Sequence, residues 1–488
     1  MKIWYDVSDV MAWNIPHLTG IQRTLVGILN GLRAAGAPVA LVRYDARAGR
    51  FRPIDDADLP PAIRRHLGQV TAAEEVAVAP EVLAPAPAPV PVPAPQPPRR
   101  KRRLRLSMRT FFGSDRHAEE LRAAFKSFRQ ASRQLRKATA RWAVGKIPGA
   151  GHAAATVVPF EGTQEPEPRV DTSRSATAFA AAGDMLVSVS ASWALSGHGE
   201  AAAVLRSRGV RVVRMIYDLI PTLKPQWLEP HHTRMITLWA REVLTTSDVV
   251  LTISEFSRRE IIRYCQECRF ETPTVAVVRL GDVMGEAAHD RTPAALPRFV
   301  PSRPFFLCVS TLDVRKNHRL LYDAWTNLSA RRGEDCPDLV CVGLPHLHVT
   351  DLLREIRQDR AVNRSIHILH GIEDAELAWY YSRCAATIYP SRYEGWGLPV
   401  AESLGHGRMC LASNATSIPE ISDLPEFFDP YDVHGVVALV ERVLDDPDWV
   451  REREETIRER FQPTAWHETA AQVLAAAEET MPAIRLGA

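Results

Sequence analysis

Residues 389–402 decide the fold prediction, and they read YPSRYEGWGLPVAE. The apolar run that leads into them, Ala385–Tyr389, is typical of a buried parallel strand. Pro399 suits the first turn of a helix, because the N–H group that proline lacks has no partner there. The stretch therefore predicts a strand, a glycine-containing loop that holds Glu394, and a helix that holds Glu402.

The chemistry of this loop indicates an anion site. Gly395 and Gly397 allow a ligand to approach the backbone closely. The free N–H groups of residues 397–400 at the helix start, together with the helix dipole, attract a diphosphate. Glu402 is then placed to accept hydrogen bonds from a ribose diol, and Glu394 from sugar hydroxyls. The spacing fits equally well a strand, turn and helix whose two glutamates are merely solvated.

The pattern of this one unit repeats along the chain. With 488 residues the chain is too long for one core, so we expect two globular domains of about 150–250 residues each and an insertion. Short apolar runs alternate with helical patterns, which is typical of parallel strands joined by crossover helices. The runs of the first series are 38–44, 185–190, 210–217, 249–254 and 275–280, and those of the second are 305–310, 339–343, 366–369, 385–389, 409–413 and 426–429. We predict an α/β fold with two doubly wound, Rossmann-like domains that divide near residue 300 and face each other across a cleft.

Residues 71–175 interrupt this pattern as an insertion in the first domain. Residues 85–98 form an Ala/Pro/Val tract, which predicts a stiff spacer. Residues 99–146 carry sixteen Lys and Arg against three acidic residues, around an apolar helical stripe. This pattern suits an anionic membrane surface. It suits equally a stripe that packs on the protein beneath solvated arginines, whereas nucleic acid is a weaker alternative because no recognition motif accompanies the charge.

Composition limits which partners, which cellular compartment and which metal sites the protein can have. The net charge of +2 says little about partners, and the seven scattered cysteines fit a reducing compartment. No window reaches the roughly 20 apolar residues of a membrane span, and the first residues lack the apolar core of a signal peptide. We therefore predict a cytoplasmic protein, with residues 99–146 as its candidate contact to the inner face of the membrane. No metal is predicted, because the acidic residues 55–58 precede a Leu-Pro-Pro sequence in a loop and are interpreted as solvated.

Further motifs connect the two glutamates to a known family. In chain order they are Val309–Asn317 (VSTLDVRKN), Val342-Gly343, Gly371–Leu377 (GIEDAEL), the Glu394/Glu402 stretch and Ser417–Glu420 (SIPE). This series resembles the retaining glycosyltransferases of family 4, which are the glycosyl transferases group 1 with the GT-B fold. The N-terminal half matches through Thr19–Arg23 (TGIQR) and Tyr217–Pro221 (YDLIP) only. The resemblance covers roughly 300 to 350 residues and excludes the insertion.

The resemblance implies roles for individual residues. Lys316 and Arg315 would neutralise the donor diphosphate, which gains negative charge as the glycosidic bond breaks. Gly20 would open a helix against the donor phosphates. Relatives carry a polar catalytic group after the strand at 185–190, whereas this chain has Ser190–Trp193, so Asp218 is the best remaining carboxylate to orient or deprotonate an acceptor. The predicted catalytic residues are Asp218, Glu394, Lys316 and Arg315, and the predicted donor-binding residues are Gly20, Arg315, Lys316, Gly395, Trp396, Gly397, Leu398 and Glu402.

These observations predict a retaining, metal-independent glycosyltransferase without a cofactor. It would move a hexose-type sugar from a nucleoside-diphosphate sugar to a hydroxyl of a glycan or lipid-linked glycan, in polysaccharide or glycoconjugate synthesis, with no nucleic-acid partner. The family also implies an N-terminal acceptor-side domain at 1–300, a nucleotide-sugar domain at 301–465 and a last segment, 466–488, that crosses back to the first domain. Two alternatives stay open: a sugar-nucleotide 2-epimerase-like isomerase, and a catalytically silent protein that docks on membranes or assembly enzymes.

Overall fold

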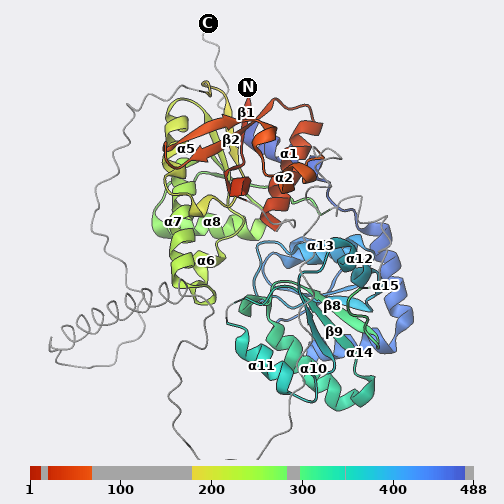
Figure 1. The fold of residues 1–488 in the computed structure, drawn as a ribbon. Helices are drawn as coiled ribbons and strands as arrows, with labels where there is room; N and C mark the ends of the chain where they lie inside the picture. Colours follow the sequence, from red (N-terminus) through yellow and green to blue (C-terminus); the bar gives the residue numbers. More distant parts are fainter. Residues whose placement is uncertain (13–19, 69–178, 283–296, 347, 479–488) are drawn as a thin grey trace, which may run out of the picture. The chain divides into compact units, whose positions relative to one another are not determined.

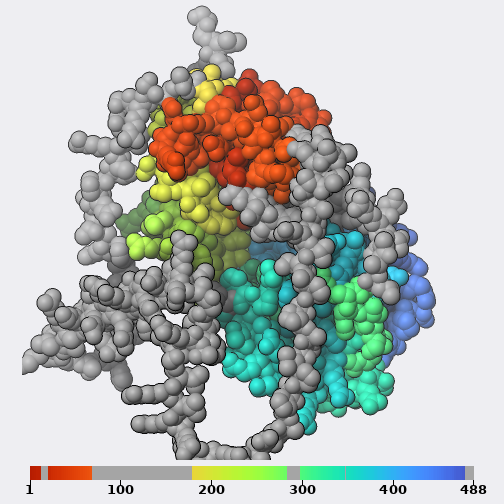
Figure 2. Space-filling model, in the orientation of Figure 1, coloured from red at the N-terminus to blue at the C-terminus, as the bar shows by residue number. Residues whose placement is uncertain are grey.

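The computed structural model describes residues 1–12, 20–68, 179–282, 297–346 and 348–478 (Figure 1). The predicted insertion at 71–175, with its basic segment at 99–146, lies outside the described residues. Within them the chain forms one seven-stranded and one six-stranded sheet. Figure 2 shows the described residues coloured along the chain.

The first sheet has the strand order β3-β2-β1-β4-β5-β6-β7. Its neighbouring strands are parallel except for β2 and β3, which form an antiparallel pair at one edge. The strands are β1 (Ile3–Asp6), β2 (Val39–Asp45), β3 (Arg50–Ile54), β4 (Met185–Ser188), β5 (Arg211–Met215), β6 (Val249–Thr252) and β7 (Thr274–Val277). In β1, β4 and β6 every residue is buried, which explains why these strands read as continuous apolar runs.

Helices join these strands. They are η1 (Ser8–Ala12), α1 (Gly20–Ala34), η2 (Asp56–Asp58), α2 (Pro61–His66), η4 (Ser192–Ala194), α5 (His198–Ser207), α6 (Ile220–Leu223), η5 (Pro225–Trp227), α7 (Pro230–Thr246) and α8 (Glu255–Cys268). Helix α1 buries Leu25, Ile28 and Leu32 against the sheet core. Helix α8 begins at a serine cap, where the Ser257 N–H donates to Ser254 Oγ at 3.0 Å.

The second sheet is parallel throughout, in the order β10-β9-β8-β11-β12-β13. Its strands are β8 (Phe305–Val309), β9 (Asp338–Val342), β10 (Ile366–Leu369), β11 (Ala386–Tyr389), β12 (Cys410–Ser413) and β13 (Glu426–Phe428). The order reverses between β8 and β11, and open sheets of this kind bind ligands beyond the carboxyl ends of the strands at such a point. Two doubly wound, Rossmann-like sheets confirm the predicted fold class.

The helices of this half are η6 (Val314–Lys316), α10 (His318–Arg332), η7 (Gly333–Asp335), α11 (Thr350–Gln358), α12 (Asp374–Arg383), α13 (Leu398–Gly405), η8 (Ile418–Glu420), α14 (Val433–Asp445), α15 (Pro447–Arg460) and α16 (Trp466–Glu478). Helices α10 and α14 bury a common apolar face under the sheet. Trp325 of α10 is fully buried there, and its indole N–H donates to the carbonyl of Pro337 at 2.9 Å. None of the described helices is both long and apolar enough to cross a membrane.

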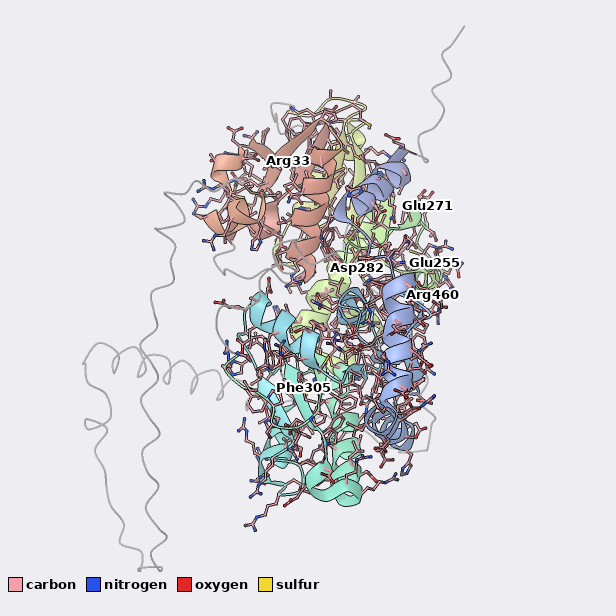
Figure 3. The ribbon with its side chains drawn as sticks, turned by 90° about the vertical axis from the view of Figure 1, so that its right-hand side faces the viewer. Arg33, Glu255, Glu271, Asp282, Phe305 and Arg460 are labelled. Atoms are coloured by element: carbon pink, nitrogen blue, oxygen red, sulfur yellow. The ribbon has the colours of Figure 1, made fainter. Side chains whose placement is uncertain are left out.

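Helix α16 packs on α1 of the first sheet. Two glycines of α1, Gly27 and Gly31, face it, and a Cβ atom at Gly27 would lie 2.2 Å from the Trp466 ring. The turn before α16 is bonded to the segment that follows β7: the Asp282 N–H donates to the Thr464 carbonyl at 3.0 Å, and the Thr464 N–H to Asp282 Oδ1 at 2.5 Å. Asp282 and the end of α15 at Arg460 are marked in Figure 3.

Candidate functional site

The loop between β11 and α13 has the predicted form. Glu394 lies in the loop, Pro399 is the second residue of α13, and Glu402 lies inside that helix. Gly397 has a φ of 140°, which side-chain-bearing residues rarely adopt. A Cβ atom at Gly395 would lie 2.9 Å from Cβ of Asp218. Gly397 therefore serves the turn, and Gly395 allows the close approach of Asp218. That the two glycines make room for a ligand stays a prediction.

The loop after β8 is fixed by caps at both ends. Asp313 accepts the N–H of Arg315 at 2.8 Å and begins the short helix η6. Asn317 has a left-handed φ of 62°, and its amide donates to the carbonyls of Pro390 at 3.1 Å and Pro430 at 2.8 Å. Arg315 and Lys316 are thereby held toward the loop that follows β11.

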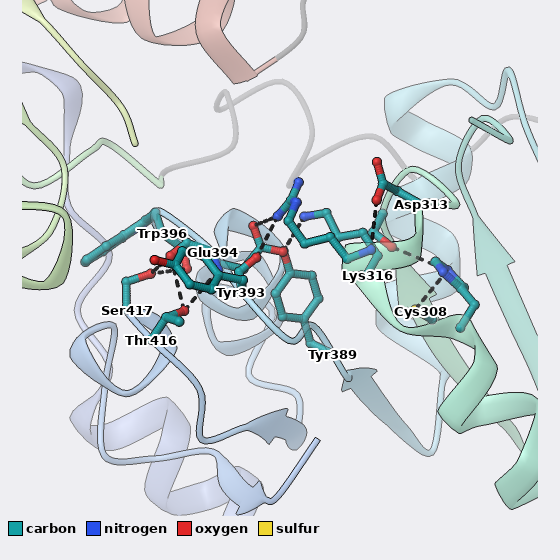
Figure 4. A network of polar contacts seen from close by, with 12 residues as sticks. Cys308, Asp313, Lys316, Tyr389, Tyr393, Glu394, Trp396, Thr416 and Ser417 are labelled. Atoms are coloured by element: carbon teal, nitrogen blue, oxygen red, sulfur yellow. Dashed lines mark hydrogen bonds and ion pairs between the residues drawn. The ribbon is translucent and has the colours of Figure 1, made fainter. Parts of the chain in front are cut away.

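Arg315, Lys316 and Glu394 form a buried ion cluster (Figure 4). Lys316 Nζ lies 2.5 Å from Glu394 Oε1, and Arg315 pairs with Glu394 Oε2. The Tyr389 hydroxyl joins the cluster, since it accepts from Lys316 Nζ at 2.9 Å and donates to Glu394 Oε1 at 2.9 Å. The exposed side-chain fractions are 20% for Arg315, 11% for Lys316 and 7% for Glu394, so the cluster is shielded but not sealed.

Burial and charge set the protonation states of the cluster. Burial alone disfavours the Glu394 carboxylate, but Arg315 and then Lys316 outweigh it and lower the pKa of Glu394 to about 2. Burial lowers the pKa of Lys316, and its neighbour Arg315 adds to this effect while Glu394 opposes it. For Arg315 burial is outweighed by Glu394, so its pKa rises. Within the cluster two cations share one carboxylate, and the more distant carboxyl groups of Asp218 and Asp313 also act on Arg315.

The backbone around Glu394 is bonded to the segment after β12. The Glu394 N–H donates to Thr416 Oγ1 at 2.9 Å, and the Ser417 hydroxyl contacts the Glu394 carbonyl at 2.8 Å and the Trp396 carbonyl at 3.1 Å. These contacts give a physical reason for the SIPE motif at Ser417. The Trp396 ring is 6% exposed and packs in the core, so this residue faces the loop through its backbone only.

Glu402 lies where α1 and α12 meet α13. It accepts the Tyr381 hydroxyl at 3.0 Å, and Arg23 NH1 lies 3.4 Å from its Oε1. Burial raises the pKa of Glu402, although Arg23 opposes the shift. Gly20 begins α1, and a Cβ atom there would lie 3.6 Å from Cδ1 of Leu398. The structure thus places Gly20 beside Leu398, in the helix that also holds Glu402. That these residues bind a donor stays a prediction.

Asp218 follows β5 and is bonded to the first turn of α6, because its Oδ1 accepts the Ile220 N–H at 2.9 Å. Burial raises the pKa of Asp218, while Arg315 opposes the rise. Its side chain lies against Gly395, so Asp218 belongs to the surroundings of the ion cluster.

Sequence reasoning missed several partners of the site. Tyr389, Tyr381 and Thr416 contact the two glutamates through hydroxyl groups, and Glu420 accepts the N–H groups of Glu255 and Phe256, both at 2.7 Å, at the start of α8. Tyr389 stands inside the decisive stretch, but a tyrosine at the end of a buried strand is also an ordinary core residue. No local signal separates the two roles.

Among the described residues, the side chains of Cys308, His318 and Cys341 form one group with metal-ligand chemistry. All three are buried below the loop after β8, and Cys308 Sγ lies 3.8 Å from His318 Nε2. Their place in the core of the second sheet is explained by packing. The absence of a metal from the reaction stays a prediction.

Comparison with known proteins agrees with this geometry. Residues 297–462 match the family model described as glycosyl transferases group 1. The chain is 27% identical over 240 residues to O-antigen chain mannosyltransferase B of Escherichia coli (49% of this chain, 62% of the relative). It is 25% identical over 269 residues to the serotype-specific mannosyltransferase WbdA of E. coli (53% and 32%). The chain thus spans less than two thirds of the length of either relative.

Two solved structures resemble part of this chain. The sucrose-phosphate synthase of Thermosynechococcus elongatus superimposes with a TM-score of 0.45 at 19% identity, over 60% of this chain and 73% of that one. Anabaena HepE in complex with UDP-glucose gives a TM-score of 0.46 at 13% identity, over 60% and 79%.

Proposed function

We propose that the protein is a retaining glycosyltransferase, because residues 297–462 match the family model of the glycosyl transferases group 1. It transfers a hexose from a nucleoside-diphosphate sugar to a hydroxyl group of a glycan or lipid-linked glycan. The product belongs to polysaccharide or glycoconjugate synthesis, and the relatives named as O-antigen and serotype-specific mannosyltransferases support this class. Their names also make mannose the first donor sugar to test.

One observation carries the proposal: Arg315 and Lys316 converge on Glu394 at the carboxyl ends of β8 and β11. This is where the strand order reverses and where ligands of such sheets bind. A diphosphate that leaves a sugar gains negative charge, and two shielded, preorganised cations stabilise that charge more than they would in water. Glu394 holds both cations in place and leaves the pair with a net charge that favours an anion.

Helix α13 and its neighbours provide the remaining contacts to the proposed donor. The N–H groups at its start, near Gly397 and Leu398, face the same loop and favour phosphate oxygens. Glu402 accepts the hydroxyl groups of the ribose in place of Arg23, whose contact with it is long. Gly20 leaves room beside Leu398, and Asp218 borders the reacting sugar.

We extend the proposal to the other partners. Cations and helix dipoles stabilise the charge of the leaving diphosphate, as a metal ion does in other transferases, so the reaction proceeds without a metal ion.

The protein works in the cytoplasm, and residues 99–146 bind the anionic inner face of the membrane. Flotation with anionic liposomes tests this contact: the full chain floats, whereas a chain without residues 80–147 stays at the bottom. Equal flotation of the two would refute it.

The activity test uses two site variants and a matched control. Release of nucleoside diphosphate from GDP-mannose and other nucleotide sugars is followed with the wild type, Lys316→Ala, Glu402→Ala and Arg319→Ala. Arg319 lies three residues beyond Lys316, pairs with Glu355 and is 40% exposed, so its loss should change little. Lys316→Ala and Glu402→Ala should abolish transfer. Near-full activity in both would overturn the donor site.

A further inference from the structure

A cavity of about 600 Å³ lies at the amino edge of the first sheet. Its lining includes Arg211, the first residue of β5, then Ser247 and Asp248, which precede β6, and residues 269–274, which lead into β7. Asp218, by contrast, lies beyond the carboxyl end of β5. The cavity therefore lies at the opposite edge of this sheet from Asp218, and its volume is in the range of small-molecule sites.

Asp248 in the lining of this cavity already has partners for both of its carboxylate oxygens. Its Oδ1 accepts from Arg206 Nε at 2.8 Å, and its Oδ2 accepts the Val212 N–H at 2.8 Å. Asp248 is thereby tied to β5, and its charge is balanced by Arg206. It needs no further cation from the cavity.

Two other arginines that line the cavity lack a counter-ion within the part of the chain that the structure describes. There the side chains of Arg211 and Arg269 form no ion pair and no hydrogen bond, and Arg211 Nε is buried without a partner. Buried polar groups of a folded protein usually have a partner. Arg269 follows α8 with a left-handed φ of 58°, a conformation typical of the end of a helix. An anion in the cavity would supply the partner that both guanidinium groups lack.

Other groups of the lining suit a sugar. Glu271, which is marked in Figure 3, is exposed and forms no ion pair within the described ranges, so its carboxylate is free to accept hydroxyl groups. Thr245 and Thr274 are exposed and add hydroxyl groups, and Phe270 adds an apolar ring. The lining carries three arginines against two acidic residues, which favours an anionic sugar over a neutral one.

We propose that this cavity is a second ligand site, which binds a phosphorylated sugar. The phosphate accepts hydrogen bonds from Arg211 and Arg269, and the sugar hydroxyl groups bond Glu271 and the two threonines. A phosphate suits the two arginines because its several oxygens can accept from separate guanidinium groups at the same time. All of these groups belong to the first sheet and the segments at its amino edge. Binding therefore depends neither on the donor site nor on glycosyl transfer.

Titration calorimetry of the full chain tests the site with mannose 6-phosphate, inorganic phosphate and mannose as ligands. Mannose is chosen because relatives of the chain are named as mannosyltransferases. Arg211→Gln and Arg269→Gln each remove one charge and keep a long polar side chain. The matched control is Arg65→Gln, which removes the same charge from an exposed arginine of α2 outside the cavity lining. Lys316→Ala separates this site from the donor site.

Arg211→Gln and Arg269→Gln should each weaken the binding of mannose 6-phosphate by about 10- to 100-fold, the usual effect of losing a charged hydrogen-bond partner. Arg269 is exposed, so its substitution tests binding without disturbing the core. Arg65→Gln and Lys316→Ala should bind mannose 6-phosphate as the wild type does. Mannose and inorganic phosphate should bind the wild type more weakly.

Absence of binding to the wild type, or equal affinity of the wild type and both cavity variants, would overturn the site. Loss of binding in Lys316→Ala alone would place the phosphate at the donor site and overturn the proposal as well. Inorganic phosphate that binds as tightly as mannose 6-phosphate would overturn the role of the groups assigned to the sugar.

Discussion

At the scale of single residues, Glu394 holds the site together. It is the counter-ion of both Arg315 and Lys316, and all three side chains are largely buried. Removal of one partner from a buried ion cluster leaves charge uncompensated, which costs about 3–5 kcal/mol. Glu394→Ala should therefore lower the free energy of unfolding by about that amount in urea titrations.

The exposed pair of Glu355 and Arg319 supplies the control for that measurement. Glu355→Ala removes the same chemical group from a solvated pair of the same domain and should change stability little. An equal effect of the two substitutions would contradict the role of Glu394 as a buried counter-ion.

The pKa of Glu394 makes this contribution depend on pH. Its folded-state pKa of about 2 lies below the ordinary value of about 4.3. The stabilisation is therefore complete above about pH 4.3 and is lost as the pH falls toward 2. The stability difference between the wild type and Glu394→Gln should be constant near neutral pH and shrink below about pH 4. A difference that grows on acidification would contradict the depressed pKa.

The pKa of Glu402 is shifted in the opposite direction to that of Glu394, because burial raises it. The ribose contact needs the carboxylate form, so nucleotide affinity should fall as the pH is lowered through a value above about 4.3. Titration calorimetry with GDP measures this. Glu402→Gln should bind weakly at every pH, and a pH dependence equal to that of the wild type would show that another group is responsible.

At the scale of elements, the contact between α1 and α16 depends on glycine. A Cβ atom at Gly27 would lie within 2.2–2.7 Å of three Trp466 ring atoms, and this ring has no flexible end that can move aside. Gly27→Ala should therefore destabilise the protein by about 1–3 kcal/mol, although alanine is the better helix former by about 1 kcal/mol.

Gly405 at the end of α13 is the matched control, since its added methyl group would meet only Phe461 at 4.0 Å. Gly405→Ala should leave the unfolding temperature unchanged or slightly raised. If Gly27→Ala behaves in the same way, the packing of α16 on α1 does not contribute to stability.

The sequence predicted the buried parallel strands well, because each is a continuous apolar run between helical patterns. Its series of runs left out the short strand β1 (Ile3–Asp6) and also β3. In β3, Arg50–Ile54 alternates charged and apolar residues and contains Pro53, a pattern of an exposed edge strand. The Gly-Trp-Gly loop was predicted in the right place, but the role of Gly395 depends on Asp218, which is distant in sequence.

At the scale of the whole molecule, the chain repeats one plan. Both sheets place their first strand in the interior, as the third strand from one edge, and the order reverses beside it. The motifs Val309–Asn317 and 389–402 follow the two strands at the reversal of the second sheet, while Asp218 follows a strand of the first. Residues far apart in sequence therefore meet because the carboxyl ends of parallel strands share one edge.

In the proposed function, the second sheet binds the donor and the first sheet binds the acceptor. Lys316 and Glu402 should then control donor binding. The sequence supplies dense motifs for the proposed donor half and only two short ones, TGIQR and YDLIP, for the N-terminal half.

The central claim is that the carboxyl edge of the second sheet binds a nucleoside-diphosphate sugar. Thermal shift of the wild type and Lys316→Ala with a panel of nucleotide sugars tests it most directly, because a ligand at 100 times its Kd stabilises the folded state by about 2.7 kcal/mol. At least one donor should raise the Tm of the wild type and leave that of Lys316→Ala unchanged. A panel that shifts neither protein, or shifts both equally, would contradict the claim.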